Sequence, residues 1–144
     1  MFKSLLPILA LALIVSSCSK SSGTLYVTGE LNSANQVPTN SSYAIGLLSG
    51  TYDDDTNILK LKTTFSSVIT PTAGHIHEGA AGVNGPVLFD LGINSGLSPF
   101  NFTSPALTTE QETALRNGEL YVNLHSVNFP NGEIRGQIVV KENL

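Results

Sequence analysis

Apolar and polar residues alternate along most of this chain from position 24 onward. In the first such segment the apolar residues Leu25, Val27 and Leu31 stand at odd positions, and polar or amphipathic residues fill the even ones. A period of two residues places successive side chains on opposite faces of a β-strand, so that one face is buried and the other meets water. The pattern therefore predicts a strand over residues 25–31.

The same period recurs between clusters of turn residues. It predicts further strands over residues 43–52, 58–65, 73–77, 86–92, 120–125 and 132–140, of which the apolar run 86–92 has the character of a buried strand. The first two of these flank the polar turn DDDTN and form a hairpin. About eight strands with a turn every 8 to 12 residues predict an all-β fold, an antiparallel, Greek-key-like β-sandwich.

The segment TTEQETALRNG carries helix signals instead. Thr108 or Thr109 can accept hydrogen bonds from the free N–H groups of a first turn, and two glutamates follow near its positive end. The Asn-Gly pair at 117–118 is a typical helix stop. We expect one short helix at the periphery of the sandwich.

The first eighteen residues have the features of an export signal. Lys3 precedes an apolar run over residues 5–15, which is about half as long as the ~20 residues of a membrane-spanning helix. The following VSSC resembles the lipobox of bacterial lipoproteins, and this resemblance implies that Cys18 is acylated and becomes the first residue of the mature chain. The predicted signal peptide is then residues 1–17. The alternative is an ordinary signal cleaved nearby, with Cys18 incidental.

Acylation of Cys18 would decide where the protein resides. Each buried acyl methylene contributes about 0.8 kcal/mol, so two or three chains anchor a protein firmly in a membrane. We expect an exported protein, lipid-anchored to the bacterial cell envelope at the outer membrane or cell surface. Residues 18–23 then form the lipidated cysteine and a flexible tether, and the folded domain spans residues 24–144. Cys18 is the only cysteine, so the domain must be stable without an internal disulfide.

Composition narrows the function classes. With 144 residues and 41% hydrophobic content the chain is long enough for one domain. Removal of residues 1–17 takes away Lys3 and leaves six bases against eleven acids, which changes the formal charge from −4 to −5. The chain has no basic cluster to neutralise phosphates, so we expect no nucleic-acid partner.

The stretch GHIHEG raises the possibility of a metal site. His75 and His77 are two apart and project from the same face of a strand, with alpha carbons roughly 6.7 Å apart, while Ile76 points into the core. By the same alternation His125 lies on the polar face of its strand. If the two strands are neighbours, three imidazoles converge, and such a set suits copper or zinc, with copper favoured by the usual affinity order. The alternative is a solvated HIH pair with His125 elsewhere.

Longer stretches resemble a known family. GHIHEGAAGVNGPVLFDLG and GELYVNLHSVNFPNGEIRGQI are similar to the CHRD domain, a module named for the animal protein chordin. NQVPTNSSYAIGLLSGTYDDDTNILKLKTTFS resembles the opening hairpin of that domain, so the similarity covers nearly all of residues 24–141. The resemblance implies a secreted β-sandwich, but the biochemical role of the family is poorly defined.

A more distant similarity concerns mechanism. Copper-zinc superoxide dismutases, also β-sandwiches, carry a G-x-H-x-H element, a later copper-binding histidine, and an arginine near the final strand that attracts the anionic substrate. GHIH, VNLH and GEIRG match this order, which implies copper ligands at His75, His77 and His125 and an anion-attracting role for Arg135. No histidine remains for a bridging or zinc position, and the disulfide and the long electrostatic loop are missing. These departures put dismutase activity in doubt.

Arg135 also has a structural interpretation, an ion pair with Glu133, Glu78 or Asp90 at the end of a sheet. We favour this interpretation, because such pairs are common at protein surfaces.

Two functions of different classes follow. The first is a cell-envelope protein that binds copper, or alternatively zinc, for storage, delivery or modest redox chemistry. The second is a non-catalytic surface interaction or adhesion module that binds a protein or glycan. The sequence assigns no catalytic residue, and dismutase-like copper redox activity is the one enzymatic activity that the resemblance leaves open.

Overall fold

The computed structural model describes residues 23–66, 68–93 and 98–141. The predicted signal peptide, Cys18 and nearly all of the predicted tether lie outside the described residues, as does most of the NSGLSP turn. Among the described residues, no helix has the length and apolarity to cross a bilayer.

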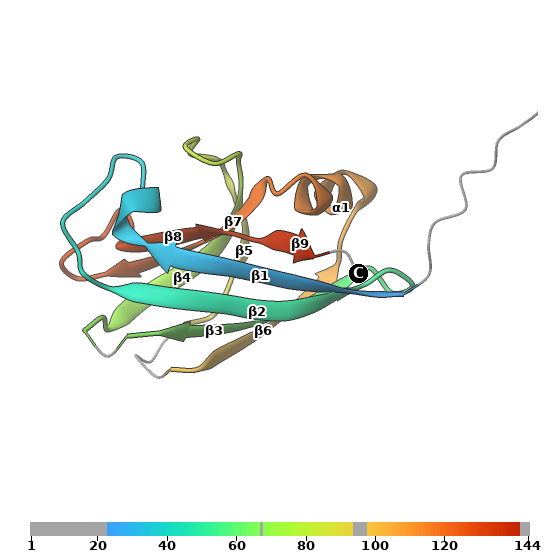
Figure 1. The fold of residues 1–144 in the computed structure, drawn as a ribbon, viewed down its shortest axis with the longest axis horizontal. Helices are drawn as coiled ribbons and strands as arrows, with labels where there is room; N and C mark the ends of the chain where they lie inside the picture. Colours follow the sequence, from blue (N-terminus) through green and yellow to red (C-terminus); the bar gives the residue numbers. More distant parts are fainter. Residues whose placement is uncertain (1–22, 67, 94–97, 142–144) are drawn as a thin grey trace, which may run out of the picture.

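The described part of the chain is built almost entirely of strands (Figure 1). The strands are β1 (Thr24–Asn32), β2 (Ile45–Asp53), β3 (Ile58–Phe65), β4 (Pro71–Glu78), β5 (Val87–Asp90), β6 (Phe100–Ala106), β7 (Leu120–Ser126), β8 (Ile134–Gln137) and β9 (Val139–Lys141). They are joined by one α-helix, α1 (Thr109–Arg116), and one short 3-10 turn, η1 (Ser33–Asn35). The predicted all-β class with a single short helix is confirmed.

All strand pairs are antiparallel and belong to one continuous sheet. Its order is β5-β4-β7-β8-β1-β2-β3-β6, and β9 also pairs with β1. The sheet curls around one apolar core into a nearly barrel-like sandwich. The two edge strands approach each other at Phe89 and Phe102, whose ring centroids lie 6.0 Å apart.

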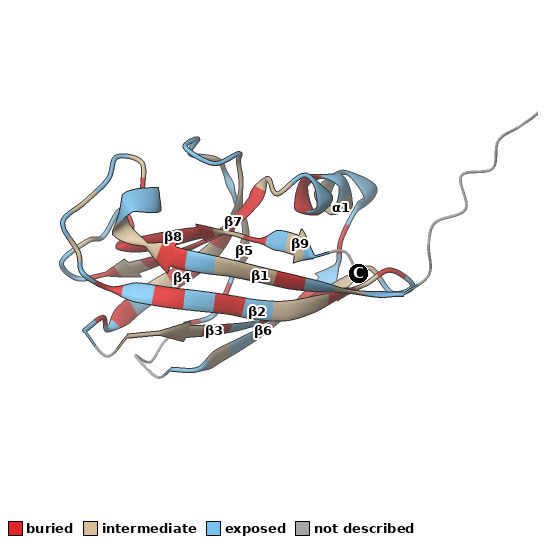
Figure 2. Ribbon diagram, viewed as in Figure 1, coloured by how far each residue is buried: buried red, intermediate tan, exposed pale blue. Residues whose placement is uncertain are grey.

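The core consists of the apolar side chains of the alternating pattern. Buried and exposed residues follow one another along β2 in Figure 2, as the two-residue period requires. Leu48, Leu59 and Leu124 are buried in the same cluster, and so is Ile76, as predicted. Full burial of one such side chain contributes about 1.5–3 kcal/mol, so these residues are the main source of stability.

The helix forms where the capping signals indicate. The Thr108 side chain accepts a hydrogen bond from the backbone N–H of Gln111, and the Gln111 side chain accepts one from the backbone N–H of Thr108. This reciprocal cap satisfies two of the N–H groups that a helix start leaves free. Leu115 is buried in the core, and Arg116 forms ion pairs with Asp54 and Glu112.

Three details of the strand prediction are wrong. β6 is not among the predicted strands, although Phe100 and Phe102 alternate with polar residues. Pro105 is tolerated near its end because β6 is an edge strand. β5 is also an edge strand rather than a buried one, and Val87 is 52% exposed. The last predicted strand is divided at Ile138, whose N–H donates to the carbonyl of Leu120.

The outer face of β4, β7 and β8 is covered rather than solvated. Tyr121, Asn123 and Arg135 point away from the apolar core, yet all three are buried. The loop after η1 contributes Gln36, whose side-chain amide donates to the Asn123 oxygen at 2.6 Å, and the loop over residues 79–86 lies against Arg135. Polar groups on this face must therefore find partners within the protein.

Candidate metal centre

The three histidines meet because β4 and β7 are neighbours. The register of the two strands places Asn123 opposite His75 and Ala73 opposite His125. His75 and His77 occupy one face of β4, and His125 occupies the same face of the sheet on β7, diagonally across from His75. The sequence left open whether the strands that carry His75 and His125 are neighbours, and the structure shows that they are.

The imidazole rings lie close to the spacing that ligands of one shared ion require. The Nδ1 atom of His75 lies 3.1 Å from the Nε2 atom of His125, and the ring centroids of His75 and His77 are 5.7 Å apart. One ring nitrogen from each histidine lies within 4.8 Å of the other two. Metal–nitrogen bonds of about 2.0–2.1 Å allow two ligands on one ion to be at most ~4.2 Å apart, so small side-chain rotations complete the site. The group can hold a metal ion.

Two of the rings are already oriented by backbone carbonyls. His77 Nδ1 lies 3.0 Å from the carbonyl oxygen of Gly85, and His125 Nδ1 lies 2.9 Å from that of Pro130. A carbonyl oxygen only accepts, so Nδ1 of each ring carries the proton and Nε2 carries a lone pair. Metal-binding histidines are commonly held in this way, with the nitrogen away from the metal donating to a carbonyl.

The Nε2 atom of His77 has no partner. It is the one buried side-chain nitrogen or oxygen without a hydrogen bond among the residues that the structure describes. A buried polar atom left unsatisfied costs about 1–3 kcal/mol, so native structures rarely retain one without a reason. A metal ion bound to this lone pair would remove the cost.

His75 is held differently from the other two. Its Nδ1 faces the free lone pair of His125 Nε2, so in the metal-free protein His75 donates this hydrogen bond. A metal ion would take the place of the shared proton and bind both nitrogens. His75 is therefore the ligand whose protonated nitrogen must change on binding.

Burial favours the neutral form of the other two histidines. Desolvation is the main reason that the pKa of His77 lies below its ordinary value of 6.5, and the charges of His75 and Arg135 act in the same direction. Burial also lowers the pKa of His125, although its hydrogen bond to the Pro130 carbonyl opposes the shift. Neutral imidazole is the form that binds a metal, so the protein environment favours binding near neutral pH.

The predicted ion pair of Arg135 is wrong. Arg135 is 1% exposed, and within the described ranges its N–H groups donate to neutral oxygens, those of Ala80, Val83, Asn84 and Gln137. Its guanidinium carbon lies 3.5 Å from the centroid of the Tyr121 ring. The prediction failed because the loop over residues 79–86 covers this face, whereas Glu133 accepts a hydrogen bond from Ser42 instead.

Tyr121 is part of the site, although it was not among the predicted site residues. Its ring stacks on His77 with a centroid distance of 4.9 Å and an interplanar angle of 6°. The available signal was its position two residues before Asn123 and four before His125, which places it on the histidine face of β7. Strand alternation alone does not reveal that this face is buried.

A comparison with known families agrees with the fold and the motifs. The family model of the CHRD domain matches residues 27–138 of the chain. Neither the curated proteins nor the solved structures gave a match. Because the match covers most of the chain, including both strands that carry the histidines, this protein belongs to the CHRD domain family.

Proposed function

We propose that this protein binds a metal ion through His75, His77 and His125, with copper as the favoured metal and zinc as the alternative. The observation that carries the proposal is the convergence of three ring nitrogens within 4.8 Å of one another. The unsatisfied Nε2 atom of His77 supports it independently, because it supplies a lone pair with no other use.

The choice of copper follows from the ligands. All three are imidazoles, and the site contains no thiolate, a combination that suits divalent copper or zinc. Copper binds more tightly than zinc to a given set of nitrogen ligands in the usual affinity order. Three protein ligands also leave a coordination position for an exogenous ligand, so a bound copper ion would supply exchange or one-electron chemistry suited to storage, delivery or modest redox reactions.

Copper titration of the purified full-length protein tests the proposal. Cys18 is replaced by serine in all samples, because a thiol binds copper by itself. We expect one copper ion per chain in the reference protein and none bound tightly in the triple His75→Ala, His77→Ala, His125→Ala variant. Equal stoichiometry and equal visible and electron paramagnetic resonance spectra in the two proteins would refute the assignment. A parallel titration with zinc decides between the two metals.

We also propose that the protein is a lipoprotein of the bacterial cell envelope. The proposal rests on the pattern of residues 1–18, with Cys18 as the acylated residue. Radiolabelled palmitate should enter the protein when it is expressed in a bacterial host, and Cys18→Ser should abolish both the label and membrane association. An unlabelled wild-type protein released to the soluble fraction would contradict the proposal.

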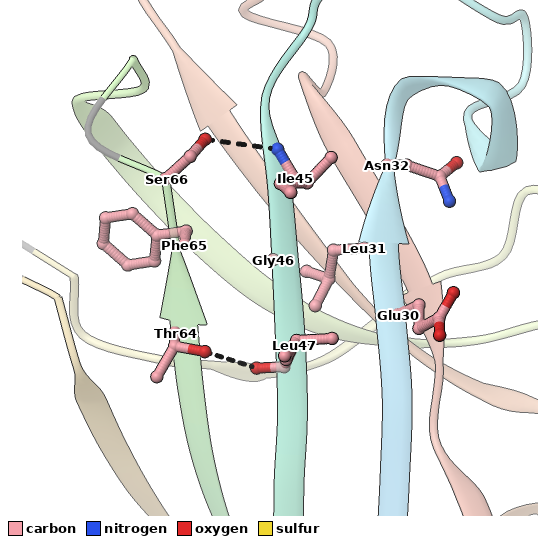
Figure 3. Close-up of a pocket in the computed structure, with 9 residues that line it drawn as sticks. All are labelled: Glu30, Leu31, Asn32, Ile45, Gly46, Leu47, Thr64, Phe65 and Ser66. Atoms are coloured by element: carbon pink, nitrogen blue, oxygen red, sulfur yellow. Dashed lines mark hydrogen bonds between the residues drawn. The ribbon is translucent and has the colours of Figure 1, made fainter.

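A second candidate function is a non-catalytic interaction or adhesion module for a protein or glycan. It is favoured by a groove of about 450 Å³ on the sheet of β1, β2 and β3, shown in Figure 3. The apolar side chains of Ile45 and Leu47 at this groove are 63% and 59% exposed. Specific binding to an immobilised glycan, lost in Leu47→Ser but retained in the triple histidine variant, would support this function over metal binding.

A further inference from the structure

Three side chains from three neighbouring strands form a stack beside the histidine cluster. His77 on β4 lies opposite Tyr121 on β7, and Arg135 on β8 lies opposite Asn123, the next residue on the same face of β7. The Tyr121 ring is parallel to the His77 ring within 6°, and the Arg135 guanidinium lies over it at 3.5 Å. Because β7 is the middle strand, Tyr121 has His77 on one side and Arg135 on the other.

The peptide groups of Gly85 link two members of this stack. The Gly85 N–H donates to the Tyr121 hydroxyl at 3.1 Å, and the Gly85 carbonyl accepts from His77 Nδ1 at 3.0 Å. A Cβ atom at this position would lie 1.5 Å from the carbonyl oxygen of Glu78, so the contact requires glycine. The orientation of the His77 ring is thus determined both by its aromatic neighbour and by one backbone carbonyl.

Arg135 holds the loop that provides this carbonyl. It donates to the carbonyl oxygens of Ala80 and Val83 at 2.9 Å each, and more weakly to the Asn84 side chain at 3.4 Å. A buried cation with no acidic partner among the described residues requires compensation, which the carbonyl dipoles and the Tyr121 π face supply here. The same guanidinium therefore fixes the loop before Gly85 and supports the ring that stacks on His77.

We propose that Arg135, acting through Tyr121 and the loop before Gly85, holds the His77 ring so that its Nε2 atom faces the metal. The inference rests on the proposed metal-binding function and deepens it. Arg135 is a positioning residue in this arrangement. The Tyr121 ring separates its guanidinium from His77, so an anion bound at the metal would not contact it, and the anion-attracting role that the dismutase resemblance implies does not fit this geometry.

An arginine is suited to this role for a geometric reason. Its planar guanidinium can lie flat on an aromatic ring while its N–H groups donate in several in-plane directions. A lysine at the same position would keep the positive charge, but its ammonium group is not planar, cannot stack flat on the ring and does not present several N–H donors in one plane. Arg135→Lys and Arg135→Gln therefore separate the contribution of the charge from that of the shape.

The metal-free full-length protein allows a direct test by nuclear magnetic resonance of the imidazole nitrogens. In the wild type we expect His77 as a single Nδ1–H tautomer with ring protons shifted by the Tyr121 ring. In Arg135→Gln and Tyr121→Leu we expect loss of that single tautomer and of the ring shift, while the His125 Nδ1–H signal, held by Pro130 on another loop, stays unchanged. Arg116→Gln is the matched control, because Arg116 also lies over a tyrosine, Tyr52, and pairs with Asp54 and Glu112 rather than with the loop or strands of the histidine cluster.

Copper affinity is the second readout. Removal of a group that orients a ligand typically costs about 10–100-fold in metal affinity, so we expect a rise in Kd of that size for Arg135→Gln, a smaller rise for Arg135→Lys, and no change for Arg116→Gln. A folded Arg135→Gln variant with wild-type His77 signals and copper Kd would overturn the proposal. If Arg135→Gln does not fold, Arg135→Lys replaces it in the test: wild-type His77 signals together with a wild-type copper Kd in that variant would overturn the proposal.

The two proposals can fail separately. Absence of copper binding in the wild type would refute the metal function, while the His77 signals of the metal-free protein still report on positioning. Tight copper binding together with His77 signals that are insensitive to Arg135 would refute positioning alone.

Discussion

The Nδ1 atom of His75 lies 3.1 Å from the Nε2 atom of His125, although the two residues are 50 positions apart in the chain. The contact exists because β4 and β7 pair directly, and it brings a third imidazole to the HIH element. In the metal-free protein this contact is a hydrogen bond, and in the metal-bound protein the ion would replace its proton.

Single substitutions should show that all three histidines contribute. Loss of one ligand from a three-nitrogen site should weaken copper binding by more than the about 10–100-fold typical of an orienting group. We expect His75→Ala, His77→Ala and His125→Ala each to exceed that range in a chelator competition assay. The nitrogen couplings in the electron paramagnetic resonance spectrum should fall from three to two. A variant with unchanged couplings would show that its histidine is not a ligand.

Copper affinity should depend on pH with a defined sign. Protons compete with the metal for the imidazole nitrogens, and burial lowers the pKa of both His77 and His125 below 6.5. Both rings therefore stay neutral to a lower pH than an exposed histidine, so we expect copper affinity to fall as the pH drops, and this fall to lie at lower pH than it does for free imidazole. Competition titrations between pH 5 and 8 on the protein and on free imidazole measure this, and a fall in the protein at the same or a higher pH than in free imidazole would contradict it.

The glycine at position 85 should be irreplaceable. A Cβ atom there would overlap the Glu78 carbonyl, so Gly85→Ala must displace the loop that accepts the His77 hydrogen bond. We expect a loss of about 1–3 kcal/mol in the free energy of unfolding, as for other overpacked positions, together with weaker copper binding. Ala81→Ser, an exposed change in the same loop, is the control and should leave both quantities at wild-type values.

The residue between the two histidines should matter for stability rather than for metal binding. Ile76 is fully buried in the core, so Ile76→Ala should lower the free energy of unfolding by about 2–5 kcal/mol and Ile76→Val by about 0.5–1.5 kcal/mol. Ile45→Ala, at a position 63% exposed, should have a much smaller effect. Urea unfolding measures all three. Equal losses at the two positions would mean that Ile76 does not face the core.

A buried tyrosine should reduce stability at alkaline pH. Burial and the neighbouring carboxylates of Glu112 and Asp54 raise the pKa of Tyr52 from 10.0 to about 12. The unfolded chain therefore loses this proton at lower pH than the folded one, so the contribution is complete below pH 10 and is lost as pH rises through 12. Tyr52→Phe should show a smaller fall in unfolding free energy between pH 9 and pH 11.5. Parallel pH dependence in the two proteins would argue against this shift.

Most of the local structure followed from the sequence. The two-residue period predicted most of the strands and put Ile76 inside and the two flanking histidines outside, because a strand alternates its side chains whatever its neighbours are. The cap at Thr108 was likewise predictable, since capping depends on residues within one helical turn. β6 was not predicted, although Phe100 and Phe102 alternate with polar residues; that Pro105 is compatible with this strand depends on its position at the sheet edge, which only the fold shows.

The sequence by itself determined which face of each strand carries the chemistry, including the faces of His75, His77 and His125. Only the tertiary structure decided that β4 lies beside β7, since local alternation carries no information about strand order. It also decided that loops cover the outer face of β7 and β8. Arg135 is therefore buried against the Tyr121 ring, whereas the sequence predicted an ion pair at the surface. Proximity and burial are properties of chain segments brought together over long sequence distances, and for that reason the convergence of the three histidines became visible only in the folded protein.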